Sequence, residues 1–528
     1  MFSAAPKRSK EFQAVVLAGH GSNLYPLTSK DTLCKALLPI GNEPMISYVL
    51  TWLEQAGILD VLILTPAPYH SSLSHHLQSF RQSQTSLGEG AMKIDLRAIE
   101  SSVLDPNSGG LTGVDGGSSD ESDGGEIDDE ILKSKTADLL RAYSNYLSTD
   151  FILLPCDFIP PPNLPLSALL DAHRTRPNAT MTSLFYERAE VGKDGPERIL
   201  VGWDRQTKSL LHVQEIEDVD DEIELRMSLL WKYPRMTLTT KLLDSHVYVF
   251  KHSVLELLTM YPQIESIREE LVPWLVKGGY QTRLAQAWKS ALNPTPNPLR
   301  LSLQHSTSFL PPSISSPSTI PPSGRSTEES LSQSLASLQI QPSHDEDDNE
   351  EESTSEEEDG RGGRKEDKVG GGKVGCGVVV WKLEDGFVAR ANTLPTYFEL
   401  NRQFVKNLAI QSTMLPPGAL PSNSSLIDAR AQISTDSLVG ASTRVGERTN
   451  VKKSVVGRHC VIGRNVKILG CVIMDFVTIG DGVKLENCIL SQRCTVEDKS
   501  DLRDCEVGGQ FTVLAESKVK NEKLANLS

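Results

Sequence analysis

Apolar residues recur every 17 positions over about the last hundred residues of the chain, in three parallel series. Successive series are offset by 6, 5 and 6 residues, so each period contains three positions of the same kind. This spacing is typical of hexapeptide repeats, which build a β-helix with three short strands per coil and one aliphatic side chain per face on its axis. The pattern predicts a left-handed parallel β-helix over 431–521. The series are Val445, Ile462, Ile479, Val496 and Val513; Val451, Ile468, Leu485, Leu502 and Val519; and Val456, Ile473, Leu490 and Val507.

Glycines and cysteines follow the same repeat. Cys471, Cys488 and Cys505 are each 17 residues apart, and we interpret them as a ladder of small packed thiols. A metal ladder is the alternative, but no histidine occurs at matching positions. We expect the glycines of the repeat to occupy tight corners that need a positive φ. They are Gly440, Gly446, Gly457, Gly463, Gly480 and Gly508.

A different pattern runs through residues 10–292, where short apolar stretches alternate with helix-like segments. A strand, a glycine-rich loop, a helix and a second strand follow one another near the start, which indicates a βαβ unit and a parallel sheet. The helix should stop at Gly57. The expected strands are 14–17, 61–65, 151–154, 179–186 and 246–250, and the expected helices are 45–55, 166–173 and 254–261.

Three segments lack such patterns. Gly, Ser and Asp dominate an insertion at about 101–130, and 293–375 is Ser/Pro-rich and then acidic, so we expect both to be disordered. Residues 376–430 are interpreted as a connecting segment. The formal net charge is −16, yet 18 acidic residues lie within 120–130 and 345–359, so the rest is nearly neutral.

Composition narrows the function classes. A chain with this charge should not bind nucleic acid through its overall field. No run of 18 apolar residues is present, which argues against a membrane span, and the first residues do not resemble a signal peptide. The cysteines show no CxxC pattern, which argues against a zinc site and a disulfide framework and favours the cytosol.

The glycine-rich loop carries the candidate chemistry. Residues 17–28 read LAGHGSNLYPLT and residues 34–45 read CKALLPIGNEPM. Backbone N–H groups of such a loop can approach a phosphate closely. The two segments resemble the nucleotidyltransferases that make nucleotide sugars, whose pattern is LAGGxGTRLxPLT followed by PKP and PxGxxP. The resemblance implies an α/β, Rossmann-like domain with a mixed, mainly parallel sheet, followed by the left-handed β-helix.

The departures from that pattern fall at the pocket. Asn23 replaces the arginine that would clamp the triphosphate, while Lys35 remains. Asp157 matches a metal-binding aspartate, but Cys156 stands in place of the preceding glycine. We therefore expect a degenerate nucleotide pocket with no catalytic residue, metal or cofactor. Two alternatives stay open: an active sugar-1-phosphate nucleotidyltransferase of the GDP-mannose pyrophosphorylase type, and a pocket that binds a nucleotide without turnover. The pocket residues are Gly19, Gly21, Asn23, Lys35 and Asp157.

Further segments point to a narrower family. EFQAVVLAG, LLDSHVYVFK, SIREELVPWLVK, RANTLPTYFELNRQ and DSLVGASTRVGERTNVKKSVVG are similar to the transferase-like subunits of eukaryotic translation initiation factor 2B, and to the gamma branch of that family. The epsilon branch continues into a helical exchange domain, which is not expected here. The resemblance implies a non-catalytic subunit that pairs with epsilon, assembles with alpha, beta and delta, and supports exchange of GDP for GTP on initiation factor 2.

Overall fold

The computed structural model describes residues 11–28, 33–85, 92–99, 135–188, 199–216, 223, 225–292, 374–406 and 426–525. The predicted insertion at 101–130 lies outside these residues, as does the predicted linker apart from its last two positions. The described parts on both sides of the linker belong to one structural unit. Among the described residues, no helix combines the length and the apolarity needed to cross a bilayer.

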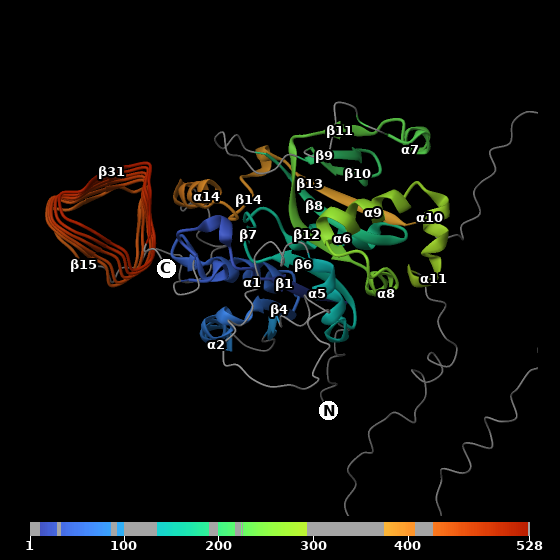
Figure 1. Ribbon diagram of the computed structural model, residues 1–528, viewed down its shortest axis with the longest axis horizontal. Helices are drawn as coiled ribbons and strands as arrows, with labels where there is room; N and C mark the ends of the chain where they lie inside the picture. Colours follow the sequence, from blue (N-terminus) through green and yellow to red (C-terminus); the bar gives the residue numbers. More distant parts are fainter. Residues whose placement is uncertain are drawn as a thin grey trace, which may run out of the picture. The chain divides into compact units, whose positions relative to one another are not determined.

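A mixed sheet of ten strands organises the first part of the chain (Figure 1). In its middle, β1 (Phe12–Leu17) pairs in parallel with β4 (Asp60–Pro66) and β6 (Asp150–Pro155). These strands are apolar runs because they are covered on both faces. The predicted α/β fold is thereby confirmed. The order is β11 (Thr237–Thr239), β9 (Ile199–Asp204), β10 (Ser209–Glu215), β13 (Gly375–Trp381), β8 (Ala179–Glu187), β12 (Leu242–Phe250), β6, β1, β4 and β5 (Lys93–Ile99).

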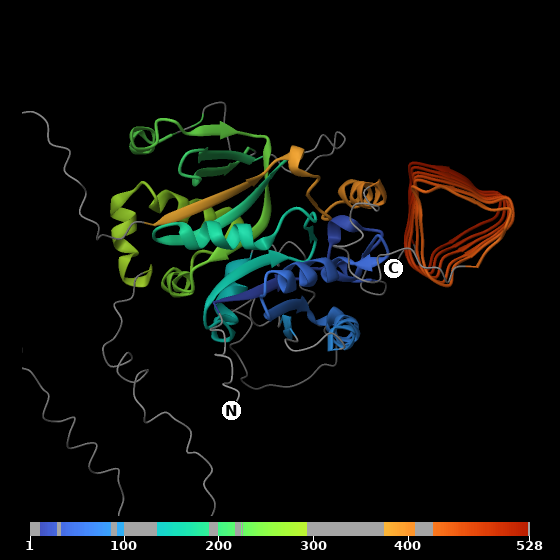
Figure 2. The same ribbon diagram turned by 180° about the vertical axis from the view of Figure 1, so that it is seen from behind.

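Helices cover both faces of this sheet, as the view from behind also shows (Figure 2). Successive residues of β6 alternate between two hydrophobic cores: Phe151 belongs to one and Ile152 to the other. Each predicted strand and helix is present, although β12 begins at Leu242 instead of His246. One face carries α1 (Met45–Gln55), α2 (His70–Thr85) and α6 (Leu166–Thr175), and the other carries α5 (Thr136–Ala142), α8 (Ser253–Met260), α9 (Val272–Gly278), α10 (Thr282–Ala287) and α11 (Lys289–Leu292).

Strand β13 lies at the start of the segment 376–430, which the sequence analysis interprets as a connecting segment. It lies between β8 and β10, and it pairs with β8 in parallel along its whole length. The glycines of GCGVVVW permit close packing, since a Cβ on Gly375 would lie 2.7 Å from the carbonyl oxygen of Asn178. The same segment continues through β14 (Ala389–Arg390) to α14 (Leu394–Lys406). The chain after the linker is therefore an integral part of the sheet domain.

Cutting the chain at a protease site introduced at position 330 should leave its two pieces associated. Hydrogen bonds and apolar packing hold β13 inside the sheet, whether or not the backbone is continuous at 330. Size-exclusion chromatography of the cut protein, with and without denaturant, measures this. Separation of the pieces in native buffer would contradict the role of β13 described above.

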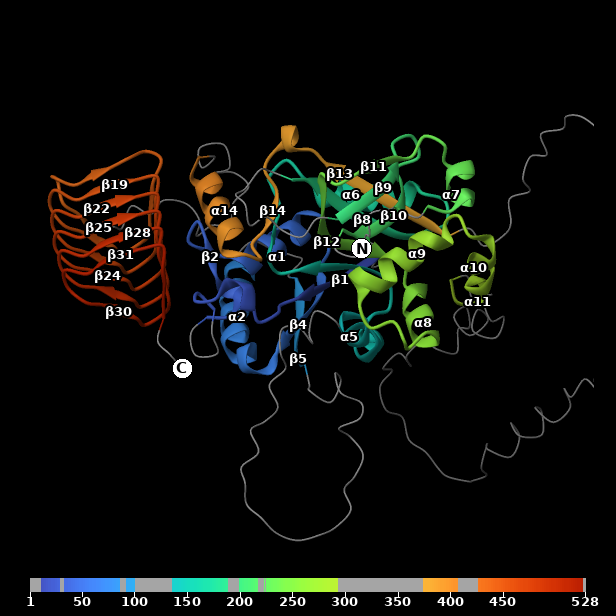
Figure 3. The same cartoon turned by 45° about the horizontal axis from the view of Figure 1, so that its top comes forward.

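The C-terminal part is a β-helix of stacked coils (Figure 3), as predicted. Equivalent strands pair in parallel, with an offset of 18 residues for β15 and β16 and of 17 residues for the later strands, for example Val445 with Ile462. The three apolar series point inward and form one core. The first face contains β15 (Leu426–Ile427), β18 (Arg444–Val445), β21 (Val461–Ile462), β24 (Thr478–Ile479), β27 (Thr495–Val496) and β30 (Thr512–Val513); the second contains β16 (Gln432–Ile433), β19 (Asn450–Lys452), β22 (Lys467–Leu469), β25 (Lys484–Glu486), β28 (Asp501–Arg503) and β31 (Lys518–Lys520); the third contains β17 (Leu438–Val439), β20 (Val455–Val456), β23 (Val472–Ile473), β26 (Ile489–Leu490), β29 (Glu506–Val507) and β32 (Lys523–Leu524).

The predicted reason for the repeat glycines is wrong. None of the six has a positive φ, and the left-handed corners belong mostly to other residues, such as Asn465 and Asn487. All of these glycines except Gly508 are needed because the adjacent coil approaches too closely for a side chain. A Cβ on Gly440 would lie 2.5 Å from the carbonyl oxygen of Gly457, and one on Gly446 would lie 2.6 Å from that of Gly463. The cysteines of the ladder are buried and free, as expected for packing.

The first four strands of the third β-helix face are apolar on their outer side as well. Their outward residues are buried in a core shared with the glycine-loop region and α14. Polar contacts border this core: the Asn42 amide donates to the Val456 carbonyl at 2.9 Å, and Arg458 pairs with Glu43. The apolar pairs of this face thus serve both the β-helix interior and its attachment. The outward residues in this core are Leu438, Val455, Val472 and Ile489, and the next two outward positions of the face are Glu506 and Lys523.

Candidate functional site

A cavity of about 520 Å³ opens at the carboxyl ends of the central strands. In open α/β sheets this edge is the usual place for a ligand. The loop after β1 and the turn after β6 meet there, joined by a hydrogen bond from the Cys156 amide to the Leu17 carbonyl. All five residues predicted for the pocket line this cavity: Gly19, Gly21, Asn23, Lys35 and Asp157.

The glycine-rich loop packs against the side chain of Lys35. Gly21 has a φ of +87°, and a Cβ there would lie 3.0 Å from the Cβ of Lys35. The Thr28 hydroxyl donates to the Gly21 carbonyl at 2.7 Å and closes the loop. Glycine is needed at 21 both for its backbone conformation and for the space that the lysine fills. His20 does not line the cavity; its ring packs against Tyr69.

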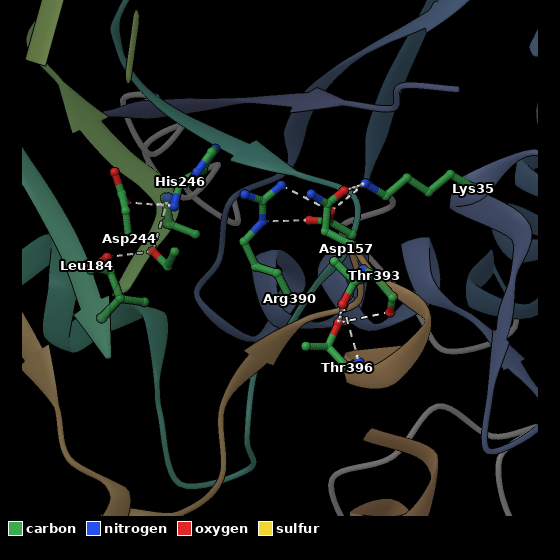
Figure 4. Close-up of polar contacts among 11 residues, drawn as sticks. Lys35, Asp157, Leu184, Asp244, His246, Arg390, Thr393 and Thr396 are labelled. Atoms are coloured by element: carbon green, nitrogen blue, oxygen red, sulfur yellow. Dashed lines mark hydrogen bonds and ion pairs between the residues drawn. The ribbon is translucent and has the colours of Figure 1, made fainter. Parts of the chain in front are cut away.

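Two cations share the carboxylate of Asp157 (Figure 4). The Lys35 ammonium lies 2.6 Å from one carboxylate oxygen. The Arg390 guanidinium donates two parallel hydrogen bonds to the two oxygens, both at 3.0 Å. Lys35 also donates to the Asn392 side chain. Asp157 is fully buried, so its charge depends on these partners.

Arg390 reaches this position through a small local sheet. Strand β14 pairs with β7 (Phe158–Ile159), which directly follows Asp157. The Ala391 amide also donates to the Asp157 carbonyl at 2.9 Å. The next residues cap α14, because the hydroxyls of Thr393 and Thr396 hydrogen-bond to each other and to nearby backbone groups. A segment far along the chain thereby delivers its guanidinium to the turn after β6.

The charges of this cluster determine its protonation. Burial alone would raise the pKa of Asp157, but Arg390 and Lys35 outweigh burial and hold this pKa well below its usual range. Burial raises the pKa of the neighbouring Cys156 thiol to about 12 and that of Cys34 to about 11. Both thiols are therefore protonated at neutral pH and are poor nucleophiles.

A second carboxylate at the cavity, Asp244, is engaged differently. It accepts a hydrogen bond from the Tyr248 hydroxyl and another from the His246 amide at 2.9 Å. Burial raises the pKa of Asp244 and lowers the pKa of His246, since in both cases it disfavours the charged form. The pairing of β12 with β8 is interrupted between Asp244 and Tyr248, which turns these side chains toward the cavity.

These residues do not fit the magnesium ion of a nucleotidyltransferase. A divalent cation needs carboxylate oxygens that are free to coordinate it. Both oxygens of Asp157 already accept from cations, and a metal there would be repelled by Arg390 and Lys35. Within the part of the chain that is described, no group of three or more His, Cys, Asp or Glu side chains is placed to hold a metal. Within this cluster two cations face one carboxylate, so the carboxylate is already neutralised without a metal.

Sequence reasoning found Lys35 and Asp157 and missed Arg390 and Asn392. Both missed residues lie in RANTLPTYFELNRQ, a segment that the sequence marks only through its family resemblance. A polar start to a segment that continues as an amphipathic helix was the available signal. Nothing in the spacing connects Arg390 with Asp157, 233 residues away.

Comparisons with known proteins agree with this architecture. Residues 13–97 match the nucleotidyl transferase family, and residues 421–519 match the EIF2B subunit epsilon LbH domain. The chain is 38% identical over 276 residues to translation initiation factor eIF2B subunit gamma of Schizosaccharomyces pombe, which covers 51% of this chain and 52% of that protein. It is 22% identical over 476 residues to the subunit of the same name from Dictyostelium discoideum, which covers 84% and 87%.

The resemblance to the sugar enzymes is shorter. A glucose-1-phosphate thymidylyltransferase of Mycobacterium tuberculosis is 39% identical over 80 residues, covering 15% of this chain and 24% of that enzyme. The chain spans about half the length of the S. pombe relative that it matches, at 52%. The sheet domain, the β-helix and these matches make the chain similar to the gamma subunits of translation initiation factor eIF2B.

Proposed function

We propose that the chain is a non-catalytic subunit of the exchange complex that replaces GDP by GTP on initiation factor 2, and that it works in the cytosol. The observation that carries this proposal is the occupation of Asp157 by Arg390 and Lys35. Phosphoryl transfer needs a charge clamp on the phosphates and a metal. Here the carboxylate that would bind the metal is already ion-paired with Lys35 and Arg390. The transferase fold would therefore serve as a scaffold.

The names of the relatives support membership of a multi-subunit complex, and the individual partners proposed here are those that the family resemblance of the sequence implies. The chain would pair with the epsilon subunit and assemble with alpha, beta and delta, and initiation factor 2 would be the substrate of the whole complex. No membrane or direct nucleic-acid contact is part of this proposal. The alternative, a sugar-1-phosphate nucleotidyltransferase, is disfavoured by the same buried cluster and by Asn23 where those enzymes have arginine.

The purified chain should release no pyrophosphate from a sugar 1-phosphate, a nucleoside triphosphate and Mg²⁺, because its pocket has no place for the metal. An active glucose-1-phosphate thymidylyltransferase in the same assay is the control. Alone, the chain should also leave the rate of GDP release from initiation factor 2 unchanged, whereas adding it to epsilon should increase the rate obtained with epsilon alone. Pyrophosphate release, or rapid GDP release by the chain alone, would contradict the proposal.

A further inference from the structure

The carboxylate that the nucleotidyltransferase pattern assigns to a metal is neutralised here by an arginine of the same chain. The Arg390 guanidinium donates from Nε to one Asp157 oxygen and from Nη2 to the other, both at 3.0 Å. Asp157 is fully buried and the Arg390 side chain is 15% exposed, so both charges are largely removed from water. A buried carboxylate needs both a compensating charge and hydrogen-bond donors, and this two-point contact supplies both.

Arg390, rather than Lys35, is what separates this cluster from a metal site. The pattern of the sugar enzymes that the chain resembles contains this lysine together with a metal-binding aspartate. Here the Lys35 ammonium lies 2.6 Å from one oxygen of Asp157 and also donates to the Asn392 side chain. The other Asp157 oxygen accepts from Arg390. Removing Arg390 would therefore free one carboxylate oxygen of its cation.

The backbone around Arg390 is fixed to the turn that carries Asp157. Arg390 pairs with Phe158 in the ladder between β14 and β7. The Ala391 amide donates to the Asp157 carbonyl at 2.9 Å. The guanidinium is therefore attached to a strand that is hydrogen-bonded to the same turn, so it cannot exchange with solvent as a free ion does.

The segment that carries this guanidinium also contacts the β-helix. We call residues 389–406, which contain β14 and α14, the arm. The Tyr397 hydroxyl donates to the Pro39 carbonyl at 2.6 Å, and the Asn401 side chain accepts from the Gly41 amide at 3.1 Å. Tyr397 is fully buried in the core that also contains the outward residues of the third β-helix face. Whatever fixes the start of the arm therefore helps to fix the surface against which the β-helix packs.

We propose that Arg390 is a tethered substitute for the divalent cation of the nucleotidyltransferase pocket, and that it fastens the arm to the sheet domain as a free ion could not. A tethered cation does not have to be bound from solution, so Asp157 stays neutralised at any concentration of Mg²⁺. The former pocket then serves as the socket of the arm. This inference goes beyond the proposed function, which needs only that the pocket performs no transfer.

Removing the guanidinium should turn the pocket into a divalent-cation site. Arg390→Gln removes the charge but keeps a polar side chain, and the freed oxygen of Asp157 can then take an ion that retains most of its water. Mn²⁺ is the probe, and its EPR signal measures binding to the full-length chain. Arg390→Gln should bind Mn²⁺ about tenfold or more tightly than the native chain, because a repulsive charge beside the carboxylate is gone. Adding Asp157→Asn should abolish this gain.

Arg174 offers the matched control, because it also makes a two-point contact with a carboxylate. Its Nε and Nη2 donate to the two oxygens of Glu11 at 2.8 and 2.7 Å, and its Nη1 donates to Asp171 at 2.7 Å. The Glu11 and Asp171 side chains are 54% and 64% exposed. Arg174→Gln thus frees two carboxylates at the surface and should leave the affinity for Mn²⁺ unchanged.

Hydrogen–deuterium exchange tests whether Arg390 fastens the arm. The α14 amides should exchange about tenfold faster or more in Arg390→Gln than in the native chain, with or without Mn²⁺, because a free ion does not hold the arm. Arg390→Lys keeps a tethered cation but loses the two-point contact. It should gain no Mn²⁺ site and should exchange at an intermediate rate, and it replaces Arg390→Gln in this measurement if that variant does not fold.

The outcomes separate this inference from the proposed function. If folded Arg390→Gln bound Mn²⁺ no better than the native chain, the substitution of a metal by Arg390 would be wrong, while the proposed function would stand. Exchange of α14 at the native rate in both Arg390 variants would overturn the fastening of the arm. Asp157-dependent binding of Mn²⁺ by the native chain would contradict both proposals, because the carboxylate would then be available to a metal.

Discussion

Replacing Asp157 by asparagine should destabilise the sheet domain by ~3–5 kcal/mol at neutral pH. The change preserves the shape of the side chain but removes the negative charge on which two buried cations depend. Arg390 and Lys35 would then remain buried and mutually repulsive, with side chains that are 15% and 9% exposed. The free energy of unfolding, measured by denaturant titration with tryptophan fluorescence, reports the loss.

Exposed ion pairs offer the control for this experiment. Asp171 pairs with Arg174 at 2.7 Å, and both side chains are largely accessible to solvent. Asp171→Asn should therefore change the free energy of unfolding by less than ~0.5 kcal/mol. A similar small effect for Asp157→Asn would show that the buried cluster tolerates the loss of its carboxylate, and would remove the argument that Asp157 is committed to these cations.

The native chain and Asp157→Asn should differ in how their stability responds to acid. The pKa of Asp157 is held below its usual value in the folded state, so its contribution is fully present above the unfolded pKa of about 3.9 and is lost as the pH falls through the lower folded value. The stability difference between the native chain and Asp157→Asn should stay constant from about pH 5 to 8 and shrink below about pH 4. If the stability difference shrank between pH 6 and 8 instead, groups other than Asp157 would be responsible for it.

Leu485→Ala should destabilise the β-helix by ~2–5 kcal/mol, because this side chain fills the centre of the axis and leaves a cavity that stacked coils cannot close. Leu485 is fully buried in β25, with a coil above and below it. Hydrogen–deuterium exchange of the coil amides measures the effect directly. Exchange should accelerate in the coils on both sides of the substitution, since each coil depends on its neighbours.

A matched substitution lies at the end of the same core. Leu524 belongs to β32, is only partly buried, and packs against the core from the last coil. Leu524→Ala should cost less than half as much and should accelerate exchange only in the last coils. Equal effects at the two positions would mean that the β-helix unfolds as a single unit rather than coil by coil.

Local patterns in the sequence were enough to predict most of the fold. The 17-residue period determines which side chains enter the β-helix, because each coil meets only the adjacent coils and its contacts repeat at a constant offset. The helix 45–55 and its end at Gly57 were predicted for a similar reason: Gly57 has a φ of +77°, and the next strand begins at Asp60. The role of the repeat glycines was predicted wrongly, since distances between coils are not visible in a pattern.

For the pocket, the sequence by itself determined two residues of the charged cluster, Lys35 and Asp157, because each belongs to a short motif. The tertiary structure alone decided that Arg390 neutralises Asp157, that β13 completes the sheet across the linker, and that α14 shares a core with the outer side of the β-helix. The physical reason is the same in all three cases. Strand pairing, buried ion pairs and packing between elements depend on which distant segments meet in space, and the sequence spacing of those segments does not encode the encounter.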